Sequence, residues 1–148
     1  MLGKGLLDIL IIEDNSGDIV LTREAFEEVG LSERVHIAKD GEDALRFLYH
    51  QPPFENAPVP DIILLDLNLP KKDGREILHE IKNDEKLKVI PVIILTTSKS
   101  EKDILSCYRS HANCYIEKPV DFDEYIKIIE MIKDFWLNLV RLPGEKKN

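Results

Sequence analysis

Acidic, hydroxyl and amine side chains follow short apolar runs at intervals along the 148-residue chain. Glu13 and Asp14 come after the first run and Asp66 after the third. Thr96 ends the fourth run, and Lys118 follows the fifth. Taken singly, each is more typical of a solvated strand end or a helix cap. If the runs are parallel strands of one sheet, however, their carboxyl ends meet at one edge, and we expect the five side chains to share a site there.

Carboxylates gathered at such an edge need positive charge. Two carboxylates about 4 Å apart repel by roughly 4 kcal/mol at an effective dielectric constant near 20. Oxygen ligands select a hard divalent cation, and a sparse Mg²⁺ site built on Asp14 and Asp66, with Glu13 acting through a water, fits this pattern. An ionised aspartate can attack phosphorus if the transferring oxygens are neutralised, and Lys118 and Thr96 can assist that chemistry.

The apolar runs alternate with helical patterns, which is typical of a parallel sheet covered by helices on both faces. The expected strands are residues 6–12, 35–38, 62–65, 91–96 and 114–116. Capping-box-like starts predict helices after Asp73, Ser100 and Asp121. Another helix is expected to run from Gly41 towards His50 and to stop before the prolines of the loop 51–60. This α/β pattern positions the polar residues at the strand ends.

The length and the net charge of the chain limit the number of domains and the kinds of partner that we expect. Residues 1–148 suffice for a single α/β domain, with an expected core of about 6–134 and a helical extension of about 135–148. The formal net charge of −8 argues against direct nucleic-acid binding and favours protein partners. No apolar stretch reaches membrane-spanning length, so we expect no membrane insertion and a cytoplasmic location.

Four motifs together resemble the receiver domains of two-component response regulators. They are Glu13-Asp14 and the segments 64–70 (LLDLNLP), 95–98 (LTTS) and 115–119 (YIEKP). They occur in the family's order and at its spacing over nearly the whole chain. The resemblance implies a flavodoxin-like (βα)5 fold, a three-layer sandwich whose five-stranded parallel sheet has the order 2-1-3-4-5.

The same resemblance implies a role for each residue. Asp66 would accept a phosphoryl group from a sensor histidine kinase, Lys118 would contact that group, and Thr96 would be the switch hydroxyl. The Mg²⁺ ligands would be Glu13, Asp14, Asp66 and the carbonyl of Asn68. Tyr115 falls where the family keeps a switch aromatic, although an edge aromatic that never moves is the alternative. The chain would be a phosphoacceptor signalling domain and not a turnover enzyme.

A narrower likeness concerns the small response regulators that serve phytochrome-type histidine kinases. It rests on the loop 51–60, the run 68–76 and the ending 135–137 with 142–143. Regulators of other sensor kinases share this build, so the sequence leaves the kinase open.

We expect the output to be made by contact with a downstream protein, because residues 141–148 are too few for an output domain. The last helix carries apolar residues on more than one side. If its second apolar face is exposed, a two-fold homodimer is expected through Ile128, Ile132, Phe135 and Trp136. The alternative is that these side chains fold back on their own domain.

Two other functions fit the sequence less well. A phosphatase of the haloacid-dehalogenase type needs a general acid two residues after its nucleophile, and Asn68 cannot protonate a leaving group. A flavin or nucleotide carrier needs a phosphate-binding loop after the first strand, where residues 13–18 are acidic and lack a glycine-rich loop.

Overall fold

Five parallel strands form one sheet in the computed structural model, which describes residues 7–143. The strands are β1 (Ile9–Ile12), β2 (Val35–Ala38), β3 (Ile62–Leu65), β4 (Val92–Thr96) and β5 (Cys114–Glu117). Their order, β2-β1-β3-β4-β5, confirms the predicted flavodoxin-like topology. The first strand is shorter than expected, since Leu7 and Asp8 precede it and Leu6 lies outside the described residues.

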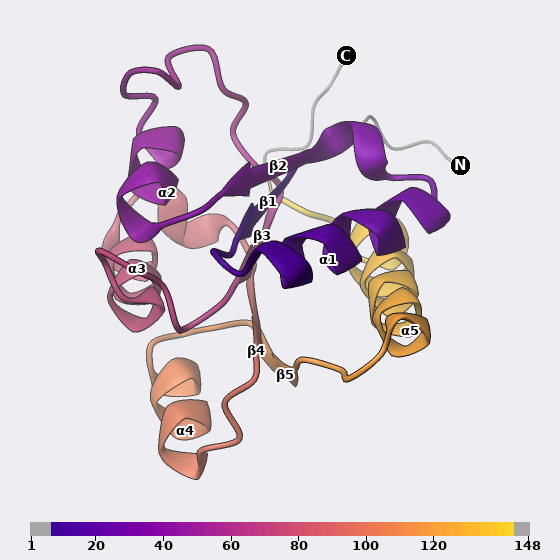
Figure 1. Ribbon diagram of the computed structural model, residues 1–148. Helices are drawn as coiled ribbons and strands as arrows, with labels where there is room; N and C mark the ends of the chain where they lie inside the picture. Colours follow the sequence, from indigo (N-terminus) through magenta and orange to yellow (C-terminus); the bar gives the residue numbers. More distant parts are fainter. Residues whose placement is uncertain (1–6, 144–148) are drawn as a thin grey trace.

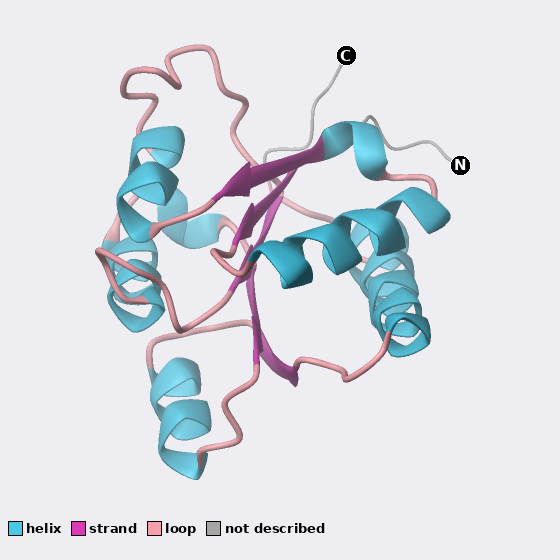
Figure 2. Cartoon of the chain, in the orientation of Figure 1, coloured by secondary structure: helices cyan, strands magenta, loops and turns pink. Residues whose placement is uncertain are grey.

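Helices cover both faces of the sheet, so the molecule has three layers (Figure 1; coloured by secondary structure in Figure 2). The helices are α1 (Ser16–Glu28), α2 (Gly41–Leu48), α3 (Gly74–Asn83), α4 (Glu101–Arg109) and α5 (Phe122–Ile132). Short 3₁₀ turns, Ser32–Arg34 and Leu87–Val89, precede β2 and β4. Helices α1 and α5 lie on one face, and α2, α3 and α4 lie on the other.

The alternation of side chains along each strand divides the core into two halves. Leu10 and Ile12 of β1 pack towards α2 and α3, whereas Ile9 and Ile11 pack towards α1 and α5. All four are buried, as expected for a strand covered on both faces. This double cover holds the carboxyl ends of the strands at a fixed edge.

Helix starts follow the capping signals. Asp73 forms a full capping box with Glu76, whereas Ser100 and Asp121 each accept only the backbone N–H three residues later. Helix α2 ends at Leu48, before the predicted end near His50. The chain turns into the left-handed region at His50 (φ 57°), so the helix has already ended when the prolines begin.

Two glycines allow helix starts to pack against the loop after β3. A β-carbon on Gly74 would lie 2.2 Å from the Asp66 carbonyl oxygen, and one on Gly41 would lie 2.4 Å from the Lys72 carbonyl oxygen. Both distances are far below van der Waals contact. The loop between Asp66 and Gly74 is therefore held closely by the first turns of α2 and α3.

The predicted C-terminal extension is helical only in its first part. A π-helical segment, Lys133–Leu139, continues α5, and residues 140–143 are not helical; 144–148 lie outside the described residues. Leu137 and Leu142 are buried in the core on the α1 and α5 face. Among the helices formed by residues 7–143, none combines the length and apolar character needed to span a membrane.

Candidate phosphoryl-acceptor site

Three acids meet at the carboxyl edge of the sheet, as the sequence predicts. Glu13 and Asp14 follow β1, and Asp66 follows β3, its neighbour in the sheet. Each offers one carboxylate oxygen, and these oxygens lie within 4.8 Å of one another. Glu13 and Asp66 are buried, whereas Asp14 is exposed. The cluster therefore has two covered acids and one that faces solvent.

Lys118, after β5, reaches across the edge into this cluster. Its Nζ lies 2.6 Å from Glu13 Oε1 and 3.2 Å from Asp66 Oδ2, and its side chain is only 4% exposed. The sequence places these residues on separate strands, and the fold brings them into direct contact. A buried ammonium group held against Asp66 is suited to balancing negative charge on that carboxylate.

Burial and neighbouring charges together shift the pKa values of Glu13 and Lys118. Burial is the main cause that raises the pKa of Glu13 to about 7, with repulsion from Asp66 adding to it and the Lys118 ammonium opposing it. For Lys118, burial lowers the pKa, but hydrogen bonds to Asp18 and Glu13 outweigh it and the pKa lies above its ordinary value. The lysine therefore stays charged at neutral pH.

Sequence reasoning missed two members of the site, Asp18 and Tyr125. Asp18, in the first turn of α1, places Oδ2 2.7 Å from Lys118 Nζ. Tyr125, a buried residue of α5, donates its hydroxyl to the other Asp18 oxygen at 3.3 Å. The position of Asp18 in the sequence could have indicated its role. Helix α1 begins at the edge where β1 ends, so an acid in its first turn can face the site.

Thr96 and Tyr115 form hydrogen bonds to the same residue of the loop between β4 and α4. Thr96 ends β4 fully buried, and its Oγ1 accepts a long hydrogen bond of 3.4 Å from the backbone N–H of Ser98. Tyr115, on β5, donates its hydroxyl to the Ser98 carbonyl at 2.9 Å. Both predicted switch residues therefore contact Ser98, in the loop between β4 and α4.

The donor set fits a hard divalent cation. Glu13, Asp14 and Asp66 supply only oxygen atoms, and two of these acids are buried with one lysine as their nearby positive partner. The backbone N–H of Asn68 lies 3.5 Å from Asp66 Oδ1, which keeps this residue next to the cluster. A Mg²⁺ ion held by these residues would offset the negative charge that the three acids place close together.

The predicted dimer residues line a groove between β5 and the end of α5. The groove, of about 470 Å³, is almost entirely apolar, and Ile128, Ile132, Phe135 and Trp136 all contribute to it. Phe135 is exposed, while Ile132 belongs to the core and forms part of the groove floor. The second apolar side expected for this helix is thus present and only partly covered.

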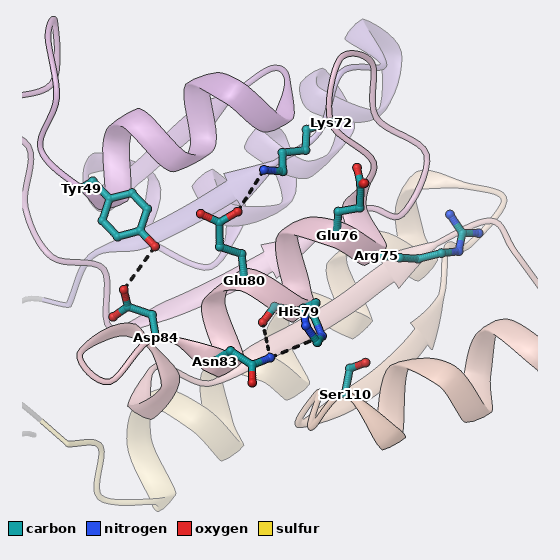
Figure 3. Close-up of a pocket in the computed structure, with 9 residues that line it drawn as sticks. All are labelled: Tyr49, Lys72, Arg75, Glu76, His79, Glu80, Asn83, Asp84 and Ser110. Carbon is teal, nitrogen blue, oxygen red and sulfur yellow. Dashed lines mark hydrogen bonds and ion pairs between the residues drawn. The ribbon is translucent and has the colours of Figure 1, made fainter.

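A further pocket, of about 670 Å³, lies along α3 (Figure 3). It is lined by Tyr49, Lys72, Arg75, Glu76, His79, Glu80, Asn83, Asp84 and Ser110. Its polar groups largely satisfy one another, with Lys72 Nζ 3.0 Å from Glu80 Oε1 and the Tyr49 hydroxyl 3.2 Å from Asp84 Oδ2. This pocket brings together none of the residues predicted to carry the chemistry.

Comparison with known proteins agrees with this geometry. Residues 9–130 match the response regulator receiver domain family. A five-stranded parallel sheet with the order 2-1-3-4-5 and an acidic carboxyl edge are what the sequence resemblance implied for that family. The chain belongs to the response regulator receiver domains, a family of signalling domains.

Among individual relatives, the chain is similar to small response regulators of cyanobacteria. Response regulator Rcp1 of Synechocystis is 45% identical over 136 residues, which are 92% of each chain. The Mn²⁺-bound form of Rcp1 superposes with a TM-score of 0.86 and 44% identity, covering 93% of this chain and 99% of that one. The phosphorylated cyanobacterial phytochrome response regulator RcpA superposes with a TM-score of 0.89 and 44% identity, covering 95% and 100%.

Likeness of this degree also extends beyond phytochrome regulators. The probable methanogenesis regulatory protein FilR2 of Methanothrix harundinacea is 42% identical over 137 residues, covering 92% of this chain and 87% of that one. These relatives are similar to this chain over most of its length, but their names refer to different processes, phytochrome response in one case and methanogenesis in another.

Proposed function

We propose that the chain is a single-domain response regulator that accepts a phosphoryl group on Asp66 from a sensor histidine kinase. The observation that carries this proposal is the position of Lys118 Nζ, 3.2 Å from Asp66 Oδ2 within a cluster of acids suited to a divalent cation. An aspartate so placed can act as a nucleophile towards phosphorus while the charge on the transferring oxygens is balanced.

In the proposed reaction, a carboxylate oxygen of Asp66 attacks the phosphorus of a phosphohistidine. A new oxygen–phosphorus bond forms as the phosphorus–nitrogen bond breaks, and the electron pair of the broken bond returns to the imidazole nitrogen. Lys118 holds its ammonium beside the acceptor oxygen and balances the incoming negative charge. When bound by Glu13, Asp14, Asp66 and the carbonyl of Asn68, Mg²⁺ supplies further positive charge for the phosphoryl oxygens.

Thr96 and Tyr115 are the proposed switch. The phosphoryl group adds about −1.5 to −2 charge and new acceptor oxygens. Thr96 donates its hydroxyl to one of these oxygens, which moves the loop at Ser98 that now contacts Thr96 Oγ1. Tyr115 then leaves the Ser98 carbonyl and turns inward. The change reaches the surface formed by α4, β5 and α5.

The chain does not turn over phosphate esters in this proposal. A hydrolase of the aspartyl-phosphate type needs an acid to protonate the leaving group, and the position two residues after Asp66 carries Asn68. The domain assists only its own phosphorylation and dephosphorylation. Signals pass to a downstream protein by contact.

A phytochrome-type histidine kinase is the proposed donor. The likeness to the cyanobacterial phytochrome response regulator RcpA, at 44% identity over 95% of the chain, supports this choice. Such kinases use ATP, so the reaction belongs in the cytoplasm. Phosphotransfer from an autophosphorylated phytochrome-type kinase should be at least as fast as from a kinase with a different sensor. A clear preference for the other kinase would remove the photoreceptor assignment, and the likeness to FilR2 makes such a test necessary.

A homodimer through the groove beside α5 is the proposed active assembly. The groove presents apolar side chains, and Phe135 and Met131 remain 47% and 63% exposed, so a second copy can cover them. Sedimentation at micromolar concentration, with and without phosphorylation, tests this point. A monomer under both conditions contradicts the dimer and leaves the phosphorylation chemistry untouched.

The phosphorylation chemistry is tested by intact-mass measurement after incubation with Mg²⁺ and acetyl phosphate. The wild-type chain should gain one phosphoryl group, and the gain should disappear in Asp66→Asn and after chelation of the metal. Asp43→Asn removes an acid from the first turn of α2, outside the site, and serves as the matched control. Equal labelling of Asp66→Asn and wild type rules out Asp66 as the sole acceptor.

A further inference from the structure

The Lys118 ammonium group is bonded to three carboxylates. A lysine has three N–H donors, and Lys118 Nζ lies 2.6 Å from Glu13, 2.7 Å from Asp18 and 3.2 Å from Asp66. The side chain is 4% exposed, so solvent offers few competing partners. The position of the ammonium group is therefore set by these acids.

Two of the three partners change their role in the proposed reaction, on which this inference rests. Asp66 becomes an acyl phosphate, and Glu13 belongs to the acids that would bind the cation. Asp18 lies outside that set of metal-binding acids. It is the partner of Lys118 that keeps its charge and its role before, during and after phosphoryl transfer.

Asp18 is itself held from two directions. Its backbone N–H donates to the side chain of Asn15, which caps α1, at 2.9 Å. Its Oδ1 accepts from the Tyr125 hydroxyl at 3.3 Å, which leaves Oδ2 for Lys118. Tyr125 is 1% exposed, and burial raises its pKa to about 12, so the hydroxyl keeps its proton at neutral pH. The carboxylate is thus oriented by α1 and α5 together.

We propose that Asp18, oriented by Tyr125, is a positioning residue that keeps the Lys118 ammonium over Asp66 throughout the phosphorylation cycle. Asp18 touches neither the phosphoryl group nor the cation in this proposal. It acts through the lysine, and Tyr125 links that position to helix α5, which lines the proposed output surface.

A different role for Asp18 makes a different prediction. If Asp18 only adds negative charge to the site, its removal should lessen the repulsion of an anionic phosphodonor and speed the reaction, whether or not the lysine is present. If Asp18 positions Lys118, its removal should slow the reaction only when the lysine is present. A double-mutant cycle separates the two roles.

The experiment measures the rate of Asp66 phosphorylation by acetyl phosphate, by intact mass at saturating Mg²⁺, in the full chain. Asp18→Ala should slow the reaction on the order of ten- to a hundredfold, because a displaced catalytic group loses much of its effect. Asp18→Asn retains an oxygen acceptor and should recover part of the rate. Tyr125→Phe should cause a smaller loss than Asp18→Ala.

The decisive comparison uses Lys118→Met. In that background, adding Asp18→Ala should change the rate by less than about twofold. Asp43→Ala is the matched control, because Asp43 holds the same position in the first turn of α2, with its backbone N–H capped by Asp40. It should leave the rate unchanged and show that loss of an acid from a helix start is not itself responsible.

A second measurement does not depend on activity. In ¹⁵N spectra of the lysine ammonium groups, Lys118 should give a signal protected from solvent exchange, which weakens in Asp18→Ala while urea unfolding confirms that the variant is folded. An unchanged rate in Asp18→Ala, a faster one, or equal slowing with and without Lys118 overturns the proposal. Failure of the wild type to gain a phosphoryl group would instead contradict the proposed function.

Discussion

Arg75 at the start of α3 is joined to Asp103 in the first turn of α4 by two parallel hydrogen bonds. Nε lies 2.9 Å from Asp103 Oδ1, and Nη2 lies 2.8 Å from Asp103 Oδ2. The Ser98 hydroxyl donates to the same carboxylate at 2.6 Å. The loop that follows Thr96 is therefore tied to the start of α3, and through it to the segment that follows Asp66.

The first prediction concerns the strength of this pair. Asp103→Asn should lower the free energy of unfolding by roughly 1 to 2 kcal/mol, because it weakens charge-assisted bonds that are partly shielded from solvent. Urea denaturation followed by circular dichroism measures the change. Lys88→Ala, which breaks the exposed pair with Glu85, is the control and should cost less than about 0.5 kcal/mol. Equal costs for the two variants would contradict the assignment.

The second prediction is a pH dependence of the same pair. Hydrogen bonds from Arg75 and Ser98 lower the pKa of Asp103 to about 2, from an ordinary value of 3.8. Because the folded-state pKa is the lower one, the stabilisation is complete well above pH 3.8 and is lost as the pH falls towards 2. The stability difference between wild type and Asp103→Asn should shrink over that interval. Carboxyl-detected NMR titration should give a midpoint near 2, and a midpoint at the ordinary value would refute the pairing.

The third prediction concerns Gly74. Ala at this position would place its β-carbon 2.2 Å from the Asp66 carbonyl oxygen, so the backbone must move. Gly74→Ala should lose roughly 1 to 3 kcal/mol of stability and also slow phosphorylation. Ile81→Ala removes a buried side chain near the other end of α3 and should cost about 2 to 5 kcal/mol while leaving the phosphorylation rate near wild type. A normal rate in Gly74→Ala would show that the site tolerates this displacement.

The fourth prediction separates acceptance of the phosphoryl group from the response to it. Thr96→Ala should still gain one phosphoryl group, because Asp66 and Lys118 are intact, but should lose the change at residues 97–100. Thr96→Ser keeps the hydroxyl and should respond like wild type. Amide ¹H–¹⁵N shifts before and after acetyl phosphate provide the measurement. Identical shift changes in Thr96→Ala and wild type would exclude the threonine as the switch.

The fifth prediction concerns the cation. Mg²⁺ bound only by the folded state should raise the free energy of unfolding by about 1.4 kcal/mol when free Mg²⁺ is ten times its dissociation constant. Asp14→Asn should lose most of this gain, because it removes the exposed acid of the cluster. Glu85→Gln, at an acid outside the cluster, should keep it. Thermal melts with Mg²⁺ and with a chelator give the comparison, and equal gains in Asp14→Asn and wild type would place the cation elsewhere.

The strand pattern and the polar strand ends were sufficient to predict that the acids and the lysine meet at one edge of the sheet. The apolar runs indicated the five strands, and the carboxyl ends of parallel strands bring Glu13, Asp66 and Lys118 to one edge. Asp18 and Tyr125 could not be recognised in this way, because their roles depend on how α1 and α5 turn towards the lysine. The pairing of Arg75 with Asp103 depends likewise on the packing of two helices that are separated in the sequence.

Helix ends were less predictable than strand ends for a related reason. Proline explains why α2 cannot continue past the loop, but the backbone turns at His50 before the first proline is reached. The π-helical winding after Ile132 also has no simple sequence signal. Both features are settled by local packing, which periodicity does not describe.

The close approach of Gly41 and Gly74 to the loop after β3 gives the two sides of the site unequal freedom. The loop that runs from Asp66 to Gly74 is closely packed, since the starts of α2 and α3 lie against its backbone at Lys72 and Asp66. The side carrying Thr96 and Ser98 is restrained mainly by hydrogen bonds, which can exchange partners. If Asp66 is phosphorylated as proposed, we expect the added charge to displace the second side and to leave the first in place, so the packing of the loop after β3 sets the direction in which the domain responds.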